Sequence, residues 1–341
     1  MDKRVIFAVA GSGKTTHIVE SLDNEKKSLI LTYTRGNHQN LKNKIIKKFN
    51  GEWPQNIVLM TYFGFLYSFC YKPFLADKIK AKGVLYEPNK NRYLNKENDS
   101  FYLFKSRYFY SNRLAFSFEH FGIIDDIKER LEKYFDELII DEIQDISGRD
   151  FNFLLKVMET NINMLFVGDF FQHTFDTSRD GNVNKNLFEN YTKYKTKFSS
   201  KGFIVDENTL DKSWRCNKET CSFVSDNLNI EIYSNRSDTK EFQMIKLEDN
   251  ESINCILNDD KIIKLHFNNS YLYGTNHKNW GETKGEDCYE DVCIILNKNT
   301  EEHFNNMNLD KLAPSTKNKL YVALTRARGN TYFISYTKLN K

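Results

Sequence analysis

With 341 residues, the chain is longer than one ordinary hydrophobic core supports, and its length predicts two domains with small insertions. The hydrophobic share of 40% and the charged share of 28% are close to globular averages and predict a soluble fold. The net charge of +3 excludes a surface that binds polyanions over its whole extent, so any nucleic-acid contact has to come from a local groove.

In chain order, the first part alternates apolar runs with amphipathic segments. Strands are predicted at 4–10, 28–34, 57–60, 137–140 and 163–167, and helices at 14–22, 37–49, 63–71 and 149–159. This alternation favours an α/β fold in which helices cover both faces of a parallel sheet. Between about residues 72 and 133 a basic and aromatic stretch interrupts the alternation, which predicts an inserted subdomain.

A polar connector at about 180–201 leads into a second predicted α/β region. Its strands are expected at 202–205, 270–273, 292–296 and 331–335, and its helices at 217–228 and 314–325. The sequence thus predicts a first domain over residues 1–190 and a second over residues 200–341.

The cysteines and the N-terminus predict a cytoplasmic protein. None of the six cysteines forms a C-x-x-C pair, and we interpret them as reduced thiols. The apolar run after Arg4 is too short for a signal peptide or a membrane span. We therefore expect no membrane partner.

A glycine-rich loop lies between the first predicted strand and helix. In Ala-Val-Ala-Gly-Ser-Gly-Lys-Thr-Thr, glycines let the backbone wrap phosphates, Lys14 can reach the β- and γ-phosphates, and the Thr15 hydroxyl suits Mg²⁺. A chance match in a flexible loop is the alternative, but the strand and the helix stand in the required order. The candidate nucleotide-binding residues are Ala10, Gly11, Ser12, Gly13, Lys14, Thr15 and Thr16.

Two adjacent carboxylates, Asp141 and Glu142, end another predicted strand in Leu-Ile-Ile-Asp-Glu-Ile-Gln-Asp. Ligands bind at the carboxyl ends of strands in open α/β sheets. Asp141 is the candidate Mg²⁺ ligand, and Glu142 the candidate base for the attacking water. A solvated acidic strand end is the simpler interpretation, but it is disfavoured beside a phosphate loop.

The two motifs resemble those of UvrD/Rep/PcrA-type superfamily 1 DNA helicases, and further segments match that family in order over nearly the whole chain. The resemblance implies two RecA-like domains with one ATP site between them. It also implies a translocase or helicase on single-stranded DNA with 3′ to 5′ polarity. Only about 70 residues separate Arg215 from Lys284, so we expect a compact variant without the family's large second-domain insertion.

The resemblance assigns roles to five further residues. Gln172, which ends Val-Gly-Asp-Phe-Phe-Gln, is the candidate γ-phosphate sensor. In Lys-Ser-Trp-Arg, Trp214 is expected to stack on adenine and Arg215 to reach the γ-phosphate. Glu286 follows Lys-Gly and is expected at the ribose or in the coupling network, while Arg326 in Tyr-Val-Ala-Leu-Thr-Arg-Ala is the second arginine finger. Both arginines could instead be ordinary surface cations.

Two more segments resemble the family's contacts to single-stranded DNA. Leu-Thr-Tyr-Thr-Arg supplies Thr34 and Arg35, and Met-Thr-Tyr-Phe-Gly-Phe supplies Thr61 and Phe63. Hydroxyls would hold phosphates there and an aromatic ring would stack on a base. The alternative is that Phe63 and Phe65 are core residues, which we favour for Phe65. Whether the aromatic insertion extends this surface stays open.

Different functions fit these motifs. The leading interpretation is an ATP- and Mg²⁺-dependent motor on single-stranded DNA or a tailed duplex, in DNA repair or anti-phage defence. The alternative is a DNA-stimulated ATPase subunit that regulates a protein partner such as a nuclease. A one-domain nucleotide kinase is disfavoured because it would not need the distal arginines.

Overall fold

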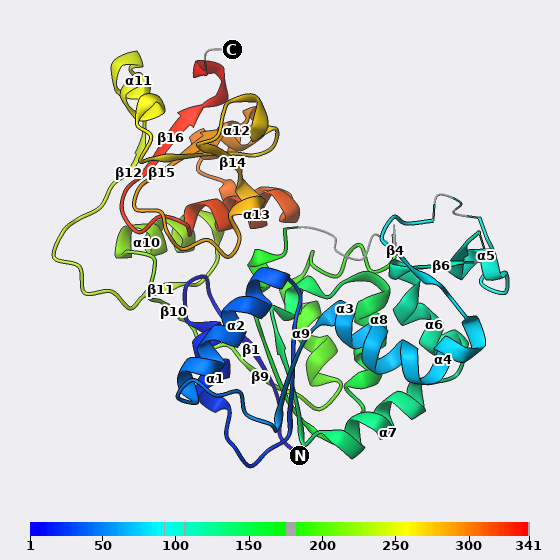
Figure 1. Ribbon diagram of the computed structural model, residues 1–341. Coiled ribbons are helices and arrows are strands. Elements are labelled where there is room, and N and C mark those ends of the chain that lie inside the picture. The colour runs from blue at the N-terminus through cyan, green and yellow to red at the C-terminus, as the bar shows by residue number, and fades with distance from the viewer. Residues whose placement is uncertain (90, 92, 106, 175–181, 340–341) are drawn as a thin grey trace. The chain divides into compact units, whose positions relative to one another are not determined.

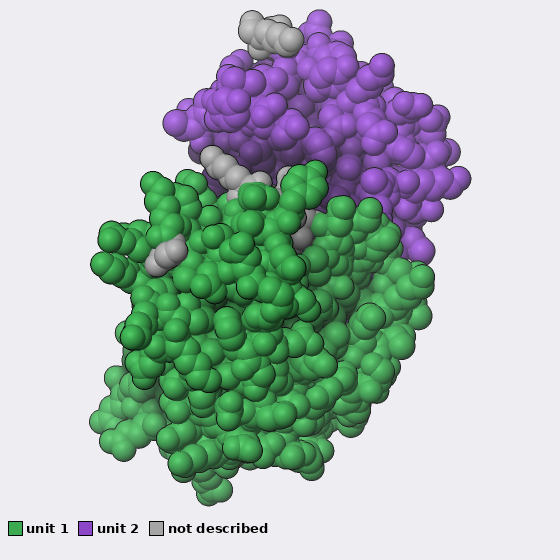
Figure 2. Space-filling model, turned by 90° about the vertical axis from the view of Figure 1, so that its right-hand side faces the viewer, with its two compact units in different colours: residues 1–6, 15–168, 176–206 green, residues 7–14, 169–175, 207–341 purple. Residues whose placement is uncertain are grey.

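The computed structural model describes residues 1–89, 91, 93–105, 107–174 and 182–339, and the chain divides into two compact units (Figures 1 and 2). Unit 1 consists of Met1–Ile6, Thr15–Gly168 and Asp176–Asp206, and unit 2 of Phe7–Lys14, Asp169–Phe175 and Glu207–Lys341. The phosphate loop therefore belongs to the unit built mainly from the C-terminal part of the chain.

Unit 1 contains a six-stranded sheet in the order β3-β2-β7-β8-β1-β9. The pairs β2–β3, β2–β7, β7–β8 and β1–β9 are parallel. The strands are β1 (Lys3–Phe7), β2 (Ser28–Thr32), β3 (Ile57–Thr61), β7 (Glu137–Asp141), β8 (Asn163–Gly168) and β9 (Ile204–Asp206). All five residues of β2 are buried, as expected of a strand covered on both faces.

Helices flank this sheet (Figure 1). They are α1 (Lys14–Ser21), α2 (Arg35–Lys48), α3 (Tyr62–Gly64), α4 (Lys72–Ile79), α6 (Leu114–His120), α7 (Ile124–Tyr134), α8 (Gly148–Val157) and α9 (Tyr191–Ser199). Between α3 and α4 the chain continues as a π-helical segment, Phe65–Tyr71, so the helix predicted at 63–71 is longer than expected.

The strand predicted at 202–205 is wrongly placed in the second sheet. It is β9, and it pairs with β1 in unit 1, with Ile204 opposite Arg4. The preceding connector contains α9, so the two elements together add one more helix and strand to the first sheet. Periodicity identifies a strand but does not say which sheet it joins.

The predicted insertion contains a small sheet in the order β4-β6-β5. Its elements are β4 (Gly83–Leu85), α5 (Asp99–Tyr102), β5 (Leu103–Phe104) and β6 (Tyr108–Tyr110). Tyr102 and Phe109 are buried, whereas Phe104, Tyr108 and Tyr93 are exposed. The aromatic residues of the insertion thus divide between a core and a surface.

Unit 2 contains a parallel five-stranded sheet in the order β12-β16-β15-β13-β14 and a two-stranded parallel pair, β10-β11. The strands are β10 (Lys212–Ser213), β11 (Tyr233–Ser234), β12 (Met244–Lys246), β13 (Ile263–His266), β14 (His277–Asn279), β15 (Val292–Leu296) and β16 (Thr331–Ser335). The helices are α10 (Lys218–Leu228), α11 (Asn250–Asn258), α12 (Lys298–Asn305) and α13 (Pro314–Leu324). The α/β class predicted from the sequence is confirmed.

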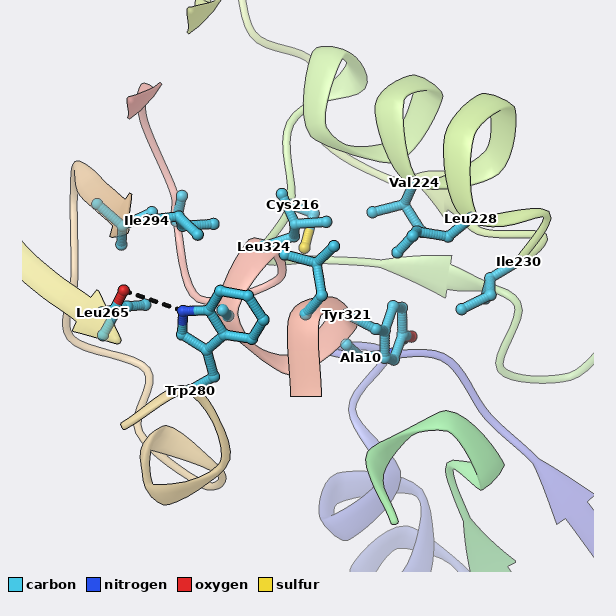
Figure 3. Close-up of a cluster of buried hydrophobic side chains, with 14 of the residues drawn as sticks. Ala10, Cys216, Val224, Leu228, Ile230, Leu265, Trp280, Ile294, Tyr321 and Leu324 are labelled. Carbon is cyan, nitrogen blue, oxygen red and sulfur yellow. Dashed lines mark hydrogen bonds between the residues drawn. The ribbon is translucent and has the colours of Figure 1, made fainter. Parts of the chain in front are cut away.

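Alternation along β15 builds the core of unit 2 on both faces of its sheet. Val292, Ile294 and Leu296 pack with residues of α10 and α13, and Cys293 and Ile295 pack on the opposite face with residues of α11. Figure 3 shows the first of these clusters, in which the indole N–H of the buried Trp280 donates to the carbonyl oxygen of Leu265 over 2.9 Å.

The strand predicted at 270–273 is wrong. Ser270–Leu272 is a 3₁₀ turn, and Tyr271 and Leu272 are exposed. The strand at this point of the sheet is β13, which the sequence analysis missed because Lys264 and His266 interrupt its apolar run. Both are buried, and the Lys264 ammonium donates to a backbone carbonyl over 2.6 Å.

None of the helices in the described part of the chain combines the length and the apolar character that a membrane crossing requires.

Candidate nucleotide-binding site

The two loop glycines meet different constraints. Gly11 has φ +73°, and a Cβ atom there would lie 2.7 Å from Cβ of Arg215 and 2.8 Å from Oγ of Ser213. Gly13 has φ +90°, and no atom of the described residues lies within 4 Å of the place of its missing Cβ. Gly11 therefore permits close packing against the segment of Arg215, while Gly13 leaves open space beside the loop, as a phosphate cradle requires.

Backbone hydrogen bonds hold the loop within unit 2. The N–H of Val9 donates to the carbonyl of Leu210 over 3.0 Å, and the N–H of Trp214 donates to the carbonyl of Gly11 over 2.9 Å. The N–H of Ala10 donates to the Tyr321 hydroxyl over 2.9 Å. The segment expected to contact adenine and the γ-phosphate is therefore bonded directly to the phosphate loop.

The remaining loop residues fit a phosphate ligand. The Ser12 hydroxyl oxygen is buried and has no partner among the described residues, and Lys14 is 9% exposed at the start of the eight-residue helix α1. Buried donors at a helix N-terminus are suited to an anion. Thr15 is half-buried, whereas Thr16 is exposed and its hydroxyl accepts from Lys44 of α2 over 3.1 Å.

The second motif ends β7 in unit 1. Asp141 is 2% exposed, and Glu142 adopts a left-handed conformation with φ +59°. Such a backbone costs a non-glycine residue on the order of 1–2 kcal/mol, and strain of this kind clusters at functional sites. The Gln144 amide donates to the Glu142 carboxylate, which fixes the direction of that side chain.

Gly168, the last residue of β8, packs closely against Ile143 and Gln144. A Cβ atom there would collide with Oε1 of Gln144 and would lie 2.6 Å from Cγ2 of Ile143. Only glycine leaves room for this approach, so Gly168 helps to hold the side chain that orients Glu142.

The residues at hand fit Mg²⁺ as well. Carboxylate and hydroxyl oxygens such as those of Asp141 and Thr15 are the ligands that Mg²⁺ prefers, together with substrate phosphates and water. No group of three or more His, Cys, Asp or Glu residues that could hold a metal ion occurs among the described residues.

Gln172 lies in a 3₁₀ turn, Phe170–Gln172, in unit 2. It is 4% exposed, and its amide donates to Oδ2 of Asp169 over 2.9 Å. The same carboxylate oxygen accepts from the Tyr321 hydroxyl over 3.0 Å. The proposed sensor is therefore hydrogen-bonded to an acid that also contacts α13.

Unit 2 brings the two candidate arginines together. Arg215 donates to the carbonyl of Thr325 over 3.0 Å and forms an ion pair with Asp287. Nη1 of Arg326 lies 4.0 Å from the same Asp287 oxygen. Neither arginine is an ordinary surface cation, since their side chains are 10% and 1% exposed.

Arg326 is enclosed by backbone carbonyls. Its guanidinium donates to Val322 over 3.1 Å, to Thr283 over 3.1 Å and to Glu286 over 3.0 Å. Burial, together with the neighbouring Arg215, lowers the pKa of Arg326 to about 10, so it stays charged at neutral pH. Its Nη2 is buried without a hydrogen-bond partner among the described residues.

Trp214 and Glu286 have contrasting surroundings. Trp214 is 67% exposed, so its ring is open to solvent. Glu286 forms an ion pair with Lys278 at 2.6 Å and accepts a hydrogen bond from Tyr289. Burial alone would raise the pKa of Glu286, but these two partners hold it below its ordinary value.

Both threonines expected to contact nucleic acid cap helices. The Thr34 hydroxyl accepts from the N–H of Asn37 at the start of α2, and the Thr61 hydroxyl accepts from the N–H of Gly64 at the start of α3, each over 3.1 Å. A capping hydroxyl still has a hydrogen to donate, so the cap does not exclude a phosphate contact. The strands β2 and β3 are neighbours, which places both threonines at one edge of the sheet.

Phe63 lies on a half-buried aromatic surface of unit 1. Its ring centroid is 5.9 Å from that of Tyr67 and 5.2 Å from that of Tyr86, whose side chain is 62% exposed. Arg35, the first residue of α2, is exposed. Phe65 is 1% exposed, which confirms its prediction as a core residue.

Two protein-family models match the chain. A model described as an AAA domain matches residues 2–176, and a model described as the viral superfamily 1 RNA helicase core domain matches residues 118–335. The chain belongs to helicase superfamily 1. No curated protein matches it.

Solved structures of helicases show the same fold at low sequence identity. A structure of arterivirus nonstructural protein 10 (helicase) is 12% identical to this chain, with a TM-score of 0.52. The match covers 97% of this chain and 59% of the arterivirus chain. A complex of arterivirus nonstructural protein 10 with DNA is 14% identical with a TM-score of 0.50, and covers 97% and 60%. The chain thus spans about six-tenths of the length of these helicases, and its two RecA-like domains follow their fold.

Three residues of the candidate site were not predicted from the sequence. Asp169, Asp287 and Tyr321 all lie inside recognised motifs, but no role was assigned to any of them. Each makes its contact with residues distant in the chain, and the only available signal was a polar side chain within a motif of otherwise assigned residues.

Proposed function

We propose that this chain is an ATP-dependent translocase or helicase on single-stranded DNA, of the UvrD/Rep/PcrA type, with 3′ to 5′ polarity. The observation that carries the proposal is the arrangement within unit 2. Arg215 lies against Gly11 of the phosphate loop, and Asp287 links Arg215 to Arg326. An arginine against a phosphate loop, with a second arginine joined to it through an aspartate, is suited to the charge that develops during phosphoryl transfer.

The proposed chemistry assigns one duty to each residue. Lys14 and the loop N–H groups hold the β- and γ-phosphates, and Thr15 and Asp141 hold Mg²⁺, which supplies charge neutralisation on the phosphate oxygens when bound. Glu142, oriented by Gln144, takes the proton of the attacking water.

The proposed recognition of ATP and of its γ-phosphate uses unit 2. Gln172 senses the γ-phosphate, Trp214 stacks on adenine, and Glu286 belongs to the ribose or coupling contacts. The exposure of the Trp214 ring supports its part, since base stacking needs an open aromatic face. Arg215 and Arg326 stabilise the phosphoryl group in the transition state.

The proposed nucleic-acid surface lies at the carboxyl ends of β2 and β3. Thr34, Arg35 and Thr61 would contact backbone phosphates, and Phe63 would stack on a base. Two observations support this surface: β2 and β3 are adjacent, and the exposed Tyr86 lies beside Phe63. Contacts of this kind tolerate any sequence, as a translocating protein requires.

Replacing Phe63 by alanine is expected to weaken binding of single-stranded DNA by about 5- to 150-fold, because a stacked base contributes about 1–3 kcal/mol. Fluorescence anisotropy of a labelled oligothymidylate measures the dissociation constant. Tyr134→Ala is the matched control, since Tyr134 is 45% exposed and ends α7 just before β7, at the opposite edge of the sheet from the carboxyl ends of β2 and β3. Equal affinities of wild type and Phe63→Ala would contradict the proposed surface.

A second function is favoured by the size of unit 2. The stretch between Arg215 and Lys284 is taken up by α10, α11 and strands of the two sheets, with no separate subdomain among its described residues. An enzyme of this kind could act as the DNA-stimulated ATPase subunit of a complex with a partner such as a nuclease, in repair or anti-phage defence. Hydrolysis would then regulate the partner.

Strand displacement separates the two functions. Duplexes with a 3′ tail, a 5′ tail or no tail are incubated with the chain, ATP and Mg²⁺, and a single-stranded RNA tail tests the choice of nucleic acid. The proposal predicts displacement on the 3′-tailed DNA only. ATP hydrolysis stimulated by DNA without displacement on any duplex would favour the regulatory subunit, and displacement from a 5′ tail would contradict the polarity.

A further inference from the structure

A chain of hydrogen bonds joins the candidate sensor to the phosphate loop through a side chain with no role assigned above. Gln172 donates to Oδ2 of Asp169 over 2.9 Å, and the Tyr321 hydroxyl donates to the same oxygen over 3.0 Å. The Tyr321 oxygen in turn accepts from the N–H of Ala10 over 2.9 Å. All four residues belong to unit 2.

The surroundings make these bonds obligatory. Ala10 and Tyr321 are 0% exposed and Asp169 is 1% exposed, so water does not replace a lost partner. A buried N–H without an acceptor is strongly disfavoured, which ties the position of Ala10 to that of the Tyr321 oxygen. Burial and the Asp169 carboxylate raise the pKa of Tyr321, so its hydroxyl keeps the proton that it donates.

Packing fixes the Tyr321 ring. It lies in the core cluster of unit 2 beside Ala10, as Figure 3 shows, and its centroid is 6.0 Å from that of Phe171 in an edge-to-face arrangement. Its backbone carbonyl accepts from the Thr325 hydroxyl over 2.8 Å, and the Thr325 carbonyl accepts from Arg215. The last turn of α13 therefore contacts the loop, the third motif and an arginine finger.

We propose that Tyr321 is a positioning residue that sets the phosphate loop for nucleotide and reports the state of the Asp169–Gln172 pair to it. This inference rests on the proposed function, since it concerns binding and hydrolysis of ATP. When Gln172 leaves Asp169 for a γ-phosphate oxygen, the Tyr321 hydroxyl still donates to Oδ2 of Asp169. The altered hydrogen bonding at Asp169 then reaches the N–H of Ala10 through the Tyr321 hydroxyl oxygen.

Tyr321→Phe tests the proposal because it removes that oxygen and keeps the ring packing. Tyr332→Phe is the matched control: Tyr332 lies in β16 and packs against the opposite face of the same sheet, away from α13. Two quantities are measured: amide exchange of a peptide covering residues 7–14, by mass spectrometry without nucleotide, and the dissociation constant of a fluorescent ATP analogue with Mg²⁺.

The expected results are faster exchange in the loop peptide and about tenfold weaker binding of the analogue in Tyr321→Phe, with neither change in Tyr332→Phe. At saturating ATP, the stimulation of turnover by single-stranded DNA is expected to fall as well. An unchanged affinity in Tyr321→Phe would overturn the positioning role, and so would an equal loss in the control variant.

A double-variant cycle tests whether Tyr321 acts through Asp169. Asp169→Asn keeps the volume of the side chain but changes the acceptor that Tyr321 and Gln172 share. If Tyr321 acts through Asp169, the combined variant binds the analogue no more weakly than the worse single variant. If the two losses of affinity multiply in the combined variant, Tyr321 does not act through Asp169.

Failure of the proposed function is distinguishable from failure of this inference. A wild-type protein that binds the analogue but hydrolyses no ATP refutes the motor, while loop exchange and affinity still decide the role of Tyr321. Wild-type protein that binds no ATP analogue overturns both.

Discussion

Glu142→Gln is expected to lower the turnover number for ATP by about 10²- to 10⁴-fold while ATP still binds, because the amide cannot take a proton from the attacking water. The strained backbone of Glu142 and the bond from Gln144 point to a side chain held in one direction. Glutamine keeps the length of the side chain, so the phosphate loop and the fold are expected to persist. Steady-state hydrolysis and equilibrium binding of an ATP analogue measure the two effects separately.

A surface carboxylate of the same unit provides the control for this variant. Glu119→Gln, at an exposed position of α6, is expected to leave both turnover and binding unchanged. Turnover of Glu142→Gln within a few-fold of wild type would exclude Glu142 as the base.

Arg326→Ala is expected to lower turnover by about 10³-fold or more, the effect typical of an arginine finger. The structure adds a second consequence. Three backbone carbonyls lose the donors that now satisfy them, so the free energy of unfolding is also expected to fall. Turnover is therefore compared per folded molecule, with the folded fraction taken from urea unfolding curves.

Arg236→Ala is the control for the structural part of this effect. Arg236 also donates to backbone carbonyls of unit 2, those of Arg215 and Arg328, but the proposal gives it no phosphate contact. It is expected to lose stability with a much smaller loss of turnover. A folded Arg326→Ala protein with wild-type turnover would refute the finger.

Local patterns carried most of what the sequence could predict. The loop glycines, the order of strand and helix around them and the apolar runs of β2, β7 and β15 are determined by nearby residues, and the structure has these elements where they were expected. The caps at Thr34 and Thr61 could also be predicted, since a threonine before a helix is a capping signal, but both residues were assigned only a nucleic-acid role.

Tertiary partners were beyond reach of the sequence. Tyr321 meets Ala10 across 311 residues, and Arg326 meets Thr283 across 43, so no spacing rule connects them. Likewise β9 has the pattern of any short strand, and only its pairing with β1 assigns it to unit 1. β13 was missed because its polar residues are buried by partners that the local pattern does not show.

The most direct test of the central claim is ATP hydrolysis by the wild-type chain with Mg²⁺, measured with and without single-stranded DNA and beside Lys14→Ala. The account predicts hydrolysis that rises many-fold with DNA and disappears in Lys14→Ala, because that ammonium holds the phosphates being cleaved. Folded wild-type protein that hydrolyses no ATP in either condition, or hydrolysis that survives in Lys14→Ala, would contradict it.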